Sequence, residues 1–229
     1  MFPNSTQAGH WMLKNEEDIQ IIKSKANMGF IQQQQRRAEC QKSDFLSEKE
    51  ESDVEFYFLV KMAEFCNKFQ PPMPKYVKGT AVHYYKRFYL HNSVMDYHPK
   101  EILVTAVYLA CKVEEFNVSI AQFVANIKGD REKAEKIILN NELLLMDALK
   151  FHLTIHNPFR PVEGLIIDVK TKAVGSDVDS WRPQIEKFID SVFLTNAILI
   201  YSPSQIALAA VIHSASSNGV RPIFKNITS

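Results

Sequence analysis

Three charged residues stand at the end of an otherwise apolar segment. Residues 102–111 carry no charged side chain, and Lys112, Glu114 and Glu115 follow directly. A lysine ammonium donates hydrogen bonds to carbonyl oxygens, and a carboxylate accepts them from N–H groups. Charges at the end of an apolar helix are of no use inside a core. We therefore expect this helix end to form a surface with a function.

Histidines and cysteines are the other residues with catalytic or metal-binding chemistry. His152 and His156 are four apart, as two metal ligands on a helix would be, but they lie in an extended segment, where we expect capping or surface roles. Cys40, Cys66 and Cys111 are widely spaced, and no C-x-x-C occurs. The sequence also lacks the phosphate-binding, dinucleotide-binding, nucleophile-elbow and H-E-x-x-H motifs. We therefore expect no metal, no cofactor and no catalytic residue.

The charge balance argues against direct binding to nucleic acid. The 229 residues include 27 Lys and Arg and 26 Asp and Glu, which gives a net charge of +1. Binding to a phosphate backbone needs a basic excess on one face. Four basic residues, Lys75, Lys78, Lys86 and Arg87, share one predicted helix and keep a nucleic-acid binder open as an alternative.

One uncharged stretch could be mistaken for a membrane span. Residues 191–220 contain no Asp, Glu, Lys or Arg, but Ser202 and Pro203 interrupt them near the middle. Each half is about 12 residues long, whereas a transmembrane helix needs about 20. The N-terminus also lacks the basic and apolar regions of a signal peptide. We expect two buried helices here and no contact with a membrane.

Helix signals recur along the whole chain. N-capping residues and apolar positions at helical spacing predict the boundaries, and prolines mark several starts and stops. The predicted helices cover residues 15–39, 47–70, 75–91, 98–115, a short segment after Ser119, 130–150, 161–173, 183–200 and 203–217, with Gly219 as the last cap. Residues 151–161 read as a linker. The fold class is therefore all-α.

An internal repeat indicates the architecture. Pro203 lies 104 positions after Pro99, and at the same spacing Ala106 matches Ala210 and Val107 matches Val211. Small residues allow neighbouring helices to approach closely, so both segments read as the central helix of a bundle. The repeat predicts two helical bundles in tandem, with five helices in the first. The second copy lacks the charges that end the first, which supports a functional role for them.

Several longer motifs resemble the cyclin family. They are residues 86–90, 92–95, 97–99, 109–119, 142–145 and 156–161, the opening His10-Trp11, and residues 201–208. The resemblance covers nearly the whole chain and is closest to the cyclins of the CDK-activating kinase. It implies tandem five-helix cyclin boxes with an N-terminal helix and an incomplete second bundle. The domains would be an N-terminal segment (1–46), a first box (47–155) and a truncated second box (156–229).

The resemblance also implies a function and partners. The chain would be a regulatory subunit rather than an enzyme. It would bind and activate a cyclin-dependent kinase together with a RING-finger assembly factor, within a general transcription and repair factor in the nucleus. The complex would phosphorylate cell-cycle kinase activation loops and the RNA polymerase II tail. The alternatives are a cyclin of another transcriptional kinase complex and a nucleic-acid-binding transcription factor with the cyclin fold.

The kinase-binding residues follow from the same resemblance. It implies that Lys112 and Glu142 are the polar pair of the interface, with Glu115 on its rim. The apolar candidates are Val113, Phe116, Met146, Phe151 and Leu153. Apolar burial would supply most of the affinity, while the polar pair would fix the orientation of the kinase.

Overall fold

The computed structural model describes residues 2–37, 45–172 and 177–218, and all the regular elements within these ranges are helices. The prediction of an all-α fold is therefore confirmed. Packing divides the chain into two compact units. The first unit is Leu13–Ile155, and the second unit combines Met1–Met12 with His156–Ser229.

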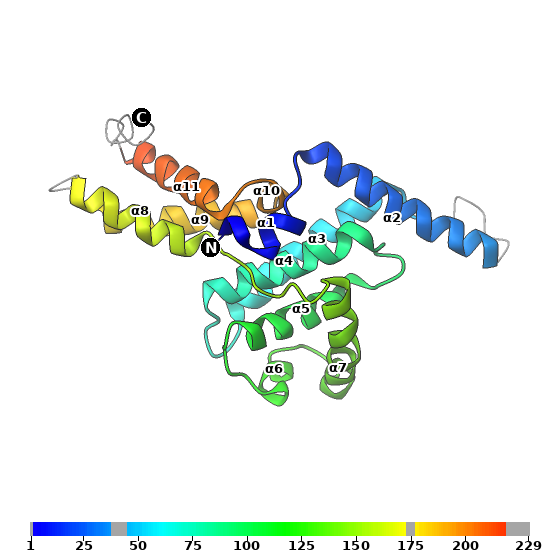
Figure 1. Cartoon of the computed structure of the whole chain (residues 1–229). Helices are drawn as coiled ribbons and strands as arrows, with labels where there is room; N and C mark the ends of the chain where they lie inside the picture. Colours follow the sequence, from blue (N-terminus) through cyan, green and yellow to red (C-terminus); the bar gives the residue numbers. More distant parts are fainter. Residues whose placement is uncertain (1, 38–44, 173–176, 219–229) are drawn as a thin grey trace. The chain divides into compact units, whose positions relative to one another are not determined.

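The first unit holds the predicted five-helix bundle and one preceding helix. Its helices are α2 (Glu16–Arg37), α3 (Glu48–Lys68), α4 (Lys75–His91), α5 (Pro99–Val113), α6 (Ile120–Ala125) and α7 (Arg131–Ala148). Helix α5 is central and packs against α3, α4 and α7, as Figure 1 shows for α4 and α7. Its residues from Ile102 to Cys111 are all buried, which explains why that segment is apolar.

Local capping chemistry fixes most of these helix boundaries. Ser47 and Ser119 form capping boxes with Glu50 and Gln122, and Asp130 accepts the backbone N–H of Lys133. These side chains satisfy N–H groups that have no partner inside the helix. The starts predicted at these three caps are confirmed.

Helix α2 is attached to the bundle through buried and charged contacts. It packs against α4 and α3, and Lys23 Nζ lies 2.6 Å from Glu55 Oε2 of α3. Burial raises the pKa of the Glu55 carboxyl, and the charge of Lys23 opposes this shift. The amide of Asn27 donates to the carbonyl of Leu46 at 3.0 Å.

The second unit has shorter elements at both ends of the chain. They are η1 (Phe2–Asn4), α1 (Thr6–His10), α8 (Phe159–Lys172), η3 (Val178–Trp181), α9 (Arg182–Phe193), α10 (Ala197–Ile200) and α11 (Pro203–Ser217). Helix α11 packs against α8 and α9. The two short helices before residue 11 were not predicted, and the amide of Gln7 connects them to the backbone of His156.

Two predicted boundaries in the second unit are wrong. The single helix expected over residues 183–200 is broken into α9 and α10. Thr195 causes the break, because its hydroxyl donates to the carbonyl of Val192 and accepts the N–H of Ala197, and such local bonds compete with helical ones. Helix α8 begins at Phe159, before the predicted Pro161, because a proline in the first turn removes no helical hydrogen bond.

The internal repeat is confirmed at the level of burial. Helices α5 and α11 have the same length and the same 104-residue spacing at both ends. Ala106 and Val107 are fully buried, and so are their counterparts Ala210 and Val211. The small residues therefore lie where the predicted close packing requires them.

Some expectations fall outside the described residues, namely Cys40, the cap Gly219 and the ends of two predicted helices at 38–39 and 173. Cys66 and Cys111 are free and buried. Within the described ranges, no helix combines the length and the apolar character needed to cross a membrane.

Candidate functional site

Lys112, in the last turn of α5, and Glu142, in the second half of α7, form an ion pair between these two neighbouring helices. Lys112 Nζ lies 2.6 Å from Oε1 and 2.9 Å from Oε2 of Glu142. The lysine side chain is 46% exposed and the glutamate 16% exposed. The Lys112 ammonium also lies 4.8 Å from the centre of the Tyr108 ring, a cation–π contact. Pairing and stacking hold the lysine in place while leaving part of it accessible.

None of the eight predicted site residues belongs to the buried core. Lys112, Glu115 and Phe151 are exposed, and Val113, Phe116, Glu142, Met146 and Leu153 are half-buried. All eight lie in the first unit, on α5, on α7 or in the segments that follow them. The apolar members are therefore not core residues, although a helical pattern alone would allow that interpretation.

Helix α5 ends in a tight cap that positions Glu115 and Phe116. The N–H of Phe116 donates to the carbonyl of Cys111 at 2.9 Å, and the N–H of Glu115 donates to that of Lys112 at 3.3 Å. Glu115 adopts a positive φ of 56°. Together these bonds form a Schellman motif with a non-glycine residue in the left-handed position. The motif turns the chain away directly after the ion pair.

Glu114 has an internal role. The Thr80 hydroxyl of α4 donates a hydrogen bond to the Glu114 carboxylate. Burial raises the pKa of Glu114, and this hydrogen bond opposes the shift. Of the three charges that end the apolar segment, Glu114 therefore fixes the end of α5 to α4, while Lys112 and Glu115 remain exposed.

Helix α7 ends in the same way, and this ending places Phe151. The N–H of Phe151 donates to the carbonyl of Met146 at 2.9 Å, and the N–H of Lys150 donates to that of Asp147 at 2.7 Å. Lys150 and Phe151 both have positive φ, at 53° and 55°. The Phe151 side chain, 57% exposed, leaves the helix end toward solvent.

Buried residues of α4 hold the segment that follows α7. The Tyr84 hydroxyl donates to the carbonyl of Leu153, and Arg87 Nη1 donates to the carbonyl of His152 at 3.3 Å. Tyr84 and Arg87 are almost completely inaccessible. The backbone around Phe151 is therefore fixed from beneath by the core of the bundle.

Sequence reasoning missed two residues of this surface, Leu139 and Leu143. Both are on α7, and they are 49% and 64% exposed. They precede Glu142 and Met146 by three residues, so the four side chains share one face of the helix. Sequence reasoning could not separate them from core residues, because residues 137–139 and 143–146 are all apolar. Each run contributes side chains to both the more buried and the exposed faces of α7. We call Lys112, Leu139, Glu142, Leu143, Met146 and Phe151 the α5–α7 surface.

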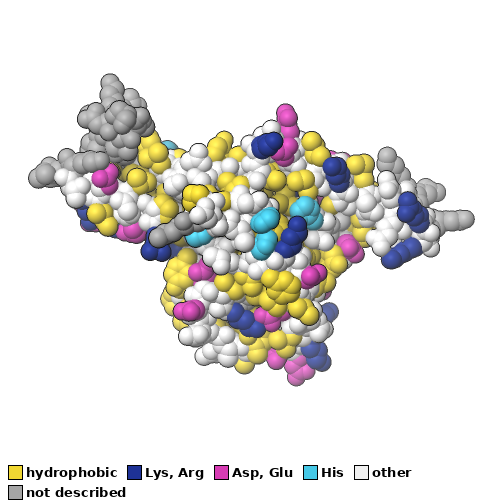
Figure 2. Space-filling model, in the orientation of Figure 1, with side chains coloured by type: hydrophobic (Ala, Val, Ile, Leu, Met, Phe, Trp, Pro, Cys, Tyr) yellow, Lys and Arg dark blue, Asp and Glu magenta, His cyan; other side chains and the backbone are white. Residues whose placement is uncertain are grey.

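The basic residues that favoured nucleic-acid binding do not form a surface. Lys75 is exposed, whereas Lys78, Lys86 and Arg87 are buried within the first unit. Burial lowers the pKa of Lys86 to about 8. On the face shown in Figure 2, basic and acidic side chains are scattered and form no continuous basic area. A phosphate backbone would find no basic stripe on α4.

The two histidines that could have bound a metal lie in a segment whose backbone is held from two different directions. The backbone of His156 bonds to Gln7, and its ring packs edge-on against Phe2 at 5.8 Å. The carbonyl of His152 accepts from Arg87. Among the described residues, no three His, Cys, Asp or Glu side chains gather as metal ligands would.

Comparison with known proteins gives consistent matches over most of the chain. The family model of the cyclin N-terminal domain matches residues 26–154, and that of the cyclin C-terminal domain matches residues 157–224. Cyclin-H of Xenopus laevis is 43% identical over 226 residues, which cover 96% of this chain and 70% of the relative.

Solved structures agree with the sequence matches. The CAK complex of Chaetomium thermophilum bound to ATP-gamma-S contains a similar chain, with a TM-score of 0.82 and 25% identity, covering 96% of this chain and 69% of that one. The yeast TFIIK (Kin28/Ccl1/Tfb3) complex contains another, with a TM-score of 0.73 and 26% identity, covering 94% and 91%.

Proposed function

The chain belongs to the cyclin family, and we propose that it is the regulatory cyclin of a CDK-activating kinase complex. The kinship with Cyclin-H and with chains of the CAK and TFIIK complexes supports this choice of complex. The α5–α7 surface carries the proposal. It combines an accessible ion pair between α5 and α7 with exposed apolar side chains on α7 and directly after it.

The proposed action is the stabilisation of one conformation of the kinase. A protein kinase is active when a helix carrying a conserved glutamate lies inward, so that this glutamate pairs with the ATP-binding lysine. A cyclin that binds only the inward state shifts the population toward it, by as much as its affinities for the two states differ. The catalytic groups would belong to the kinase, and the chain itself would perform no phosphotransfer.

Within this surface, the polar and apolar groups would have separate roles. Lys112 has N–H donors and Glu142 has lone pairs that their mutual contact does not exhaust, and these would meet backbone carbonyls and amides of the kinase. Leu139, Leu143 and Phe151 would lose their exposed area on binding, which supplies affinity. Each helix-end cap would keep its aromatic residue in place.

Further partners follow from the same assignment. We propose a RING-finger assembly factor as the third subunit, membership of a general transcription and repair factor, and a nuclear location. The substrates would be activation loops of cell-cycle kinases and the RNA polymerase II tail. Co-purification of the chain from cells, followed by identification of the kinase, separates this complex from other transcriptional kinase complexes.

Co-expression of the chain with the candidate kinase tests the proposal. Lys112→Ala or Glu142→Ala should weaken kinase binding by about 2–5 kcal/mol, because each leaves the other charge unpaired inside the interface. The free energy of unfolding of the isolated chain should change by less than about 1 kcal/mol, as is usual for an exposed ion pair. Binding is measured by retention of the kinase on the tagged chain and by titration.

A second exposed pair provides the matched control. Lys170 Nζ lies 2.6 Å from Asp179 Oδ2 in the second unit, with similar exposure of the lysine. Lys170→Ala should leave kinase binding unchanged. The exchanged pair Lys112→Glu with Glu142→Lys should keep the stability of the chain and lose the kinase. Undiminished kinase retention by both alanine variants would refute the assignment of the surface.

A further inference from the structure

The ring of Tyr108 lies against the Lys112 ammonium on α5. Side chains of a helix lean toward its N-terminus, so a residue lies over the one four positions earlier. The Lys112 ammonium accordingly lies 4.8 Å from the centre of the Tyr108 ring. Tyr108 is only 7% exposed, whereas the Lys112 side chain is 46% exposed. A partner would therefore meet Tyr108 mainly through the lysine rather than by direct contact.

A cluster of aromatic side chains fixes the orientation of this ring. The Tyr108 ring packs against Phe123 of α6 with a centroid distance of 5.1 Å and an interplanar angle of 62°. This edge-to-face arrangement is one that aromatic rings favour. Phe123 is fully buried and packs in turn against Phe65 and Phe69, at the end of α3, with centroid distances of 5.7 and 5.4 Å. The ring that faces Lys112 is therefore held by α3 and α6 together.

The internal repeat shows that a central helix can pack without this ring. At the spacing of 104 residues that relates α5 to α11, the counterpart of Tyr108 is Ile212 and that of Lys112 is Ser216. Both helices pack in their bundles, yet only α5 has the aromatic ring and the lysine at these positions. The two residues thus occur together in one copy and are both replaced in the other, which favours a joint role.

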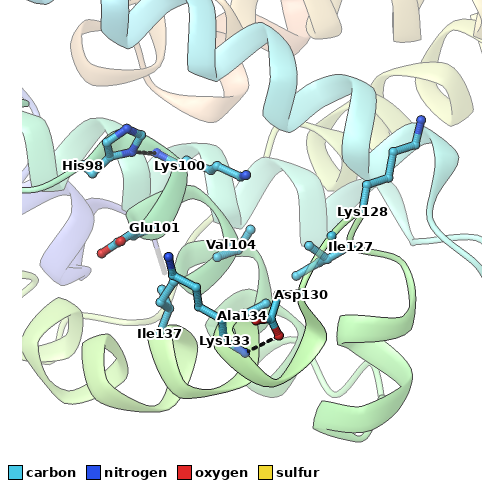
Figure 3. Close-up of a pocket in the computed structure, with 11 residues that line it drawn as sticks. His98, Lys100, Glu101, Val104, Ile127, Lys128, Asp130, Lys133, Ala134 and Ile137 are labelled. Carbon is cyan, nitrogen blue, oxygen red and sulfur yellow. Dashed lines mark hydrogen bonds between the residues drawn. The ribbon is translucent and has the colours of Figure 1, made fainter.

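The start of α5 offers a lysine for comparison. Lys100 and Val104 have the same four-residue spacing, and both line a pocket beside the start of α7 (Figure 3). In the reverse order along the helix, the neighbour of this lysine is aliphatic, whereas that of Lys112 is aromatic. Lys100 is exposed, as Lys112 is. Lys100 is therefore the matched control for the loss of a lysine from α5.

We propose that Tyr108 is a positioning residue for kinase recognition, a role that rests on the proposed function. Its ring would hold the Lys112 ammonium at the α5–α7 surface and attract it more strongly once the kinase excludes water. In the free chain the lysine is nearly half exposed, and a cation–π contact is weak at exposed sites. The same contact is stronger when it is desolvated. Tyr108 would therefore contribute more to kinase affinity than to the stability of the free chain.

The free chain provides the first measurement, without the kinase. Protons that lie over an aromatic ring resonate upfield, so the methylene protons of Lys112 next to its ammonium should be shifted in this direction. Their resonances are assigned by comparison with Lys112→Met. Tyr108→Phe should keep the upfield shift, and Tyr108→Leu should abolish it. Unshifted protons in the unchanged chain would overturn the proposal, whatever the kinase does.

Titration with the kinase tests the role of the ring itself. Tyr108→Phe should bind the kinase like the unchanged chain, because the aromatic face is retained. A third variant has trifluorophenylalanine at position 108. Fluorine withdraws electron density from the ring and weakens its attraction for a cation, while the size of the ring changes little. This variant should bind the kinase about fivefold more weakly than Tyr108→Phe. Urea unfolding of the free chain should be the same for both.

A double-mutant cycle separates attraction of the lysine from packing of the ring. In the Lys112→Met background, fluorination should change kinase affinity by less than about twofold, because the cation is gone. In the Lys100→Met background, the full effect of about fivefold should remain. An equal effect of fluorination with and without Lys112, or no effect in the unchanged chain, would refute the role of Tyr108 alone. A chain that binds no kinase at all would instead refute the proposed function, and the role of Tyr108 with it.

Discussion

The exposure of Leu139 and Leu143 distinguishes the face of α7 that can bind a partner from the face that packs in the bundle. They are four residues apart on α7, and their neighbours Ile138 and Leu145 are fully buried. Scattered exposed leucines are common on soluble proteins, but these two share one face of α7 with Glu142 of the Lys112–Glu142 pair. In the free chain these two side chains expose apolar surface to water, which lowers solubility. Binding of a partner would bury that surface.

Leu143→Gln should weaken kinase binding by about tenfold, because a 64% exposed leucine that becomes buried in an interface contributes on the order of 1–2 kcal/mol. The unfolding free energy of the free chain should change by less than about 0.5 kcal/mol. Titration with the kinase and urea unfolding measure the two effects. Ile167→Gln, at a 62% exposed position of α8, is the control and should leave kinase binding intact.

His83 is a titratable residue inside the first unit. It is 2% exposed, and its Nδ1 has no hydrogen-bond partner among the described residues. Burial lowers its pKa well below 6.5, and the charges of Arg87 and Lys86 lower it further. The folded chain therefore keeps this imidazole neutral at a pH where the unfolded chain protonates it.

Acidification should consequently destabilise the first unit through His83. Above pH 6.5 the residue is neutral in both states, and below it only the unfolded state gains a proton. The contribution of His83 to the free energy of unfolding should then fall by about 1 kcal/mol between pH 6.5 and 5.5. Urea unfolding of His83→Gln should show a correspondingly smaller slope between pH 6.5 and 5.5. An unchanged slope would mean that the imidazole is protonated in the folded chain.

At the scale of elements, α5 and α7 share one design. Both end in a Schellman motif whose left-handed position is occupied by a residue with a Cβ, Glu115 or Lys150. Both motifs are followed by a phenylalanine, Phe116 or Phe151. Left-handed backbone is unfavourable for such residues and is tolerated where surrounding contacts fix it, often at functional sites.

Lys150→Gly should stabilise the chain by about 0.5–1 kcal/mol, because glycine adopts a φ of 53° without steric strain. The gain stays this small because glycine also makes the unfolded chain more flexible. Lys136→Gly, in the interior of the same helix, should instead destabilise by about 1 kcal/mol. Urea unfolding distinguishes the two. Equal destabilisation by both substitutions would contradict the strained geometry at Lys150.

At the scale of the whole molecule, the beginning of the chain packs into the second unit. Gln7 is buried, and its amide makes two hydrogen bonds with His156, 149 residues away: the His156 N–H donates at 2.7 Å and the Gln7 amide donates to the His156 carbonyl at 3.4 Å. Trp11, which belongs to the same unit, is also buried. The chain thus begins in the second unit, forms the first unit with residues 13–155, and continues in the second unit from residue 156.

Gln7→Ala should destabilise the second unit by about 1–3 kcal/mol, because it leaves the backbone groups of His156 without their partner in a partly buried place. Hydrogen exchange, followed separately in α8 to α11 and in α3 to α7, should show faster opening of the second unit only. Gln20→Ala, an exposed position of α2, should change neither. Equal acceleration in both units would contradict the assignment of residues 2–12.

The amino-acid sequence by itself determined the features that depend on neighbouring residues. Ser47, Ser119 and Asp130 marked helix starts because each caps the N–H three positions away. The matched positions Ala106 and Ala210 revealed the repeat because close helix packing demands small side chains. Thr195, by contrast, breaks a helix through bonds that were overlooked although they too are local. The family resemblance supplied Lys112 and Glu142, whose spacing of thirty residues has no local signal.

Only the tertiary structure decided which apolar residues are buried and which distant groups meet. Residues 143–146 are uniformly apolar, so no periodicity separates the buried Leu145 from the exposed Leu143, and the packing of α7 against α5 makes that choice. The same holds for Lys78, Lys86 and Arg87 of α4, which are buried although Lys75 of the same helix is exposed. The bond from His156 to Gln7 likewise depends on a contact that no local pattern encodes. Local sequence determines where most of the helices begin and end, and long-range packing determines which face of each helix is buried.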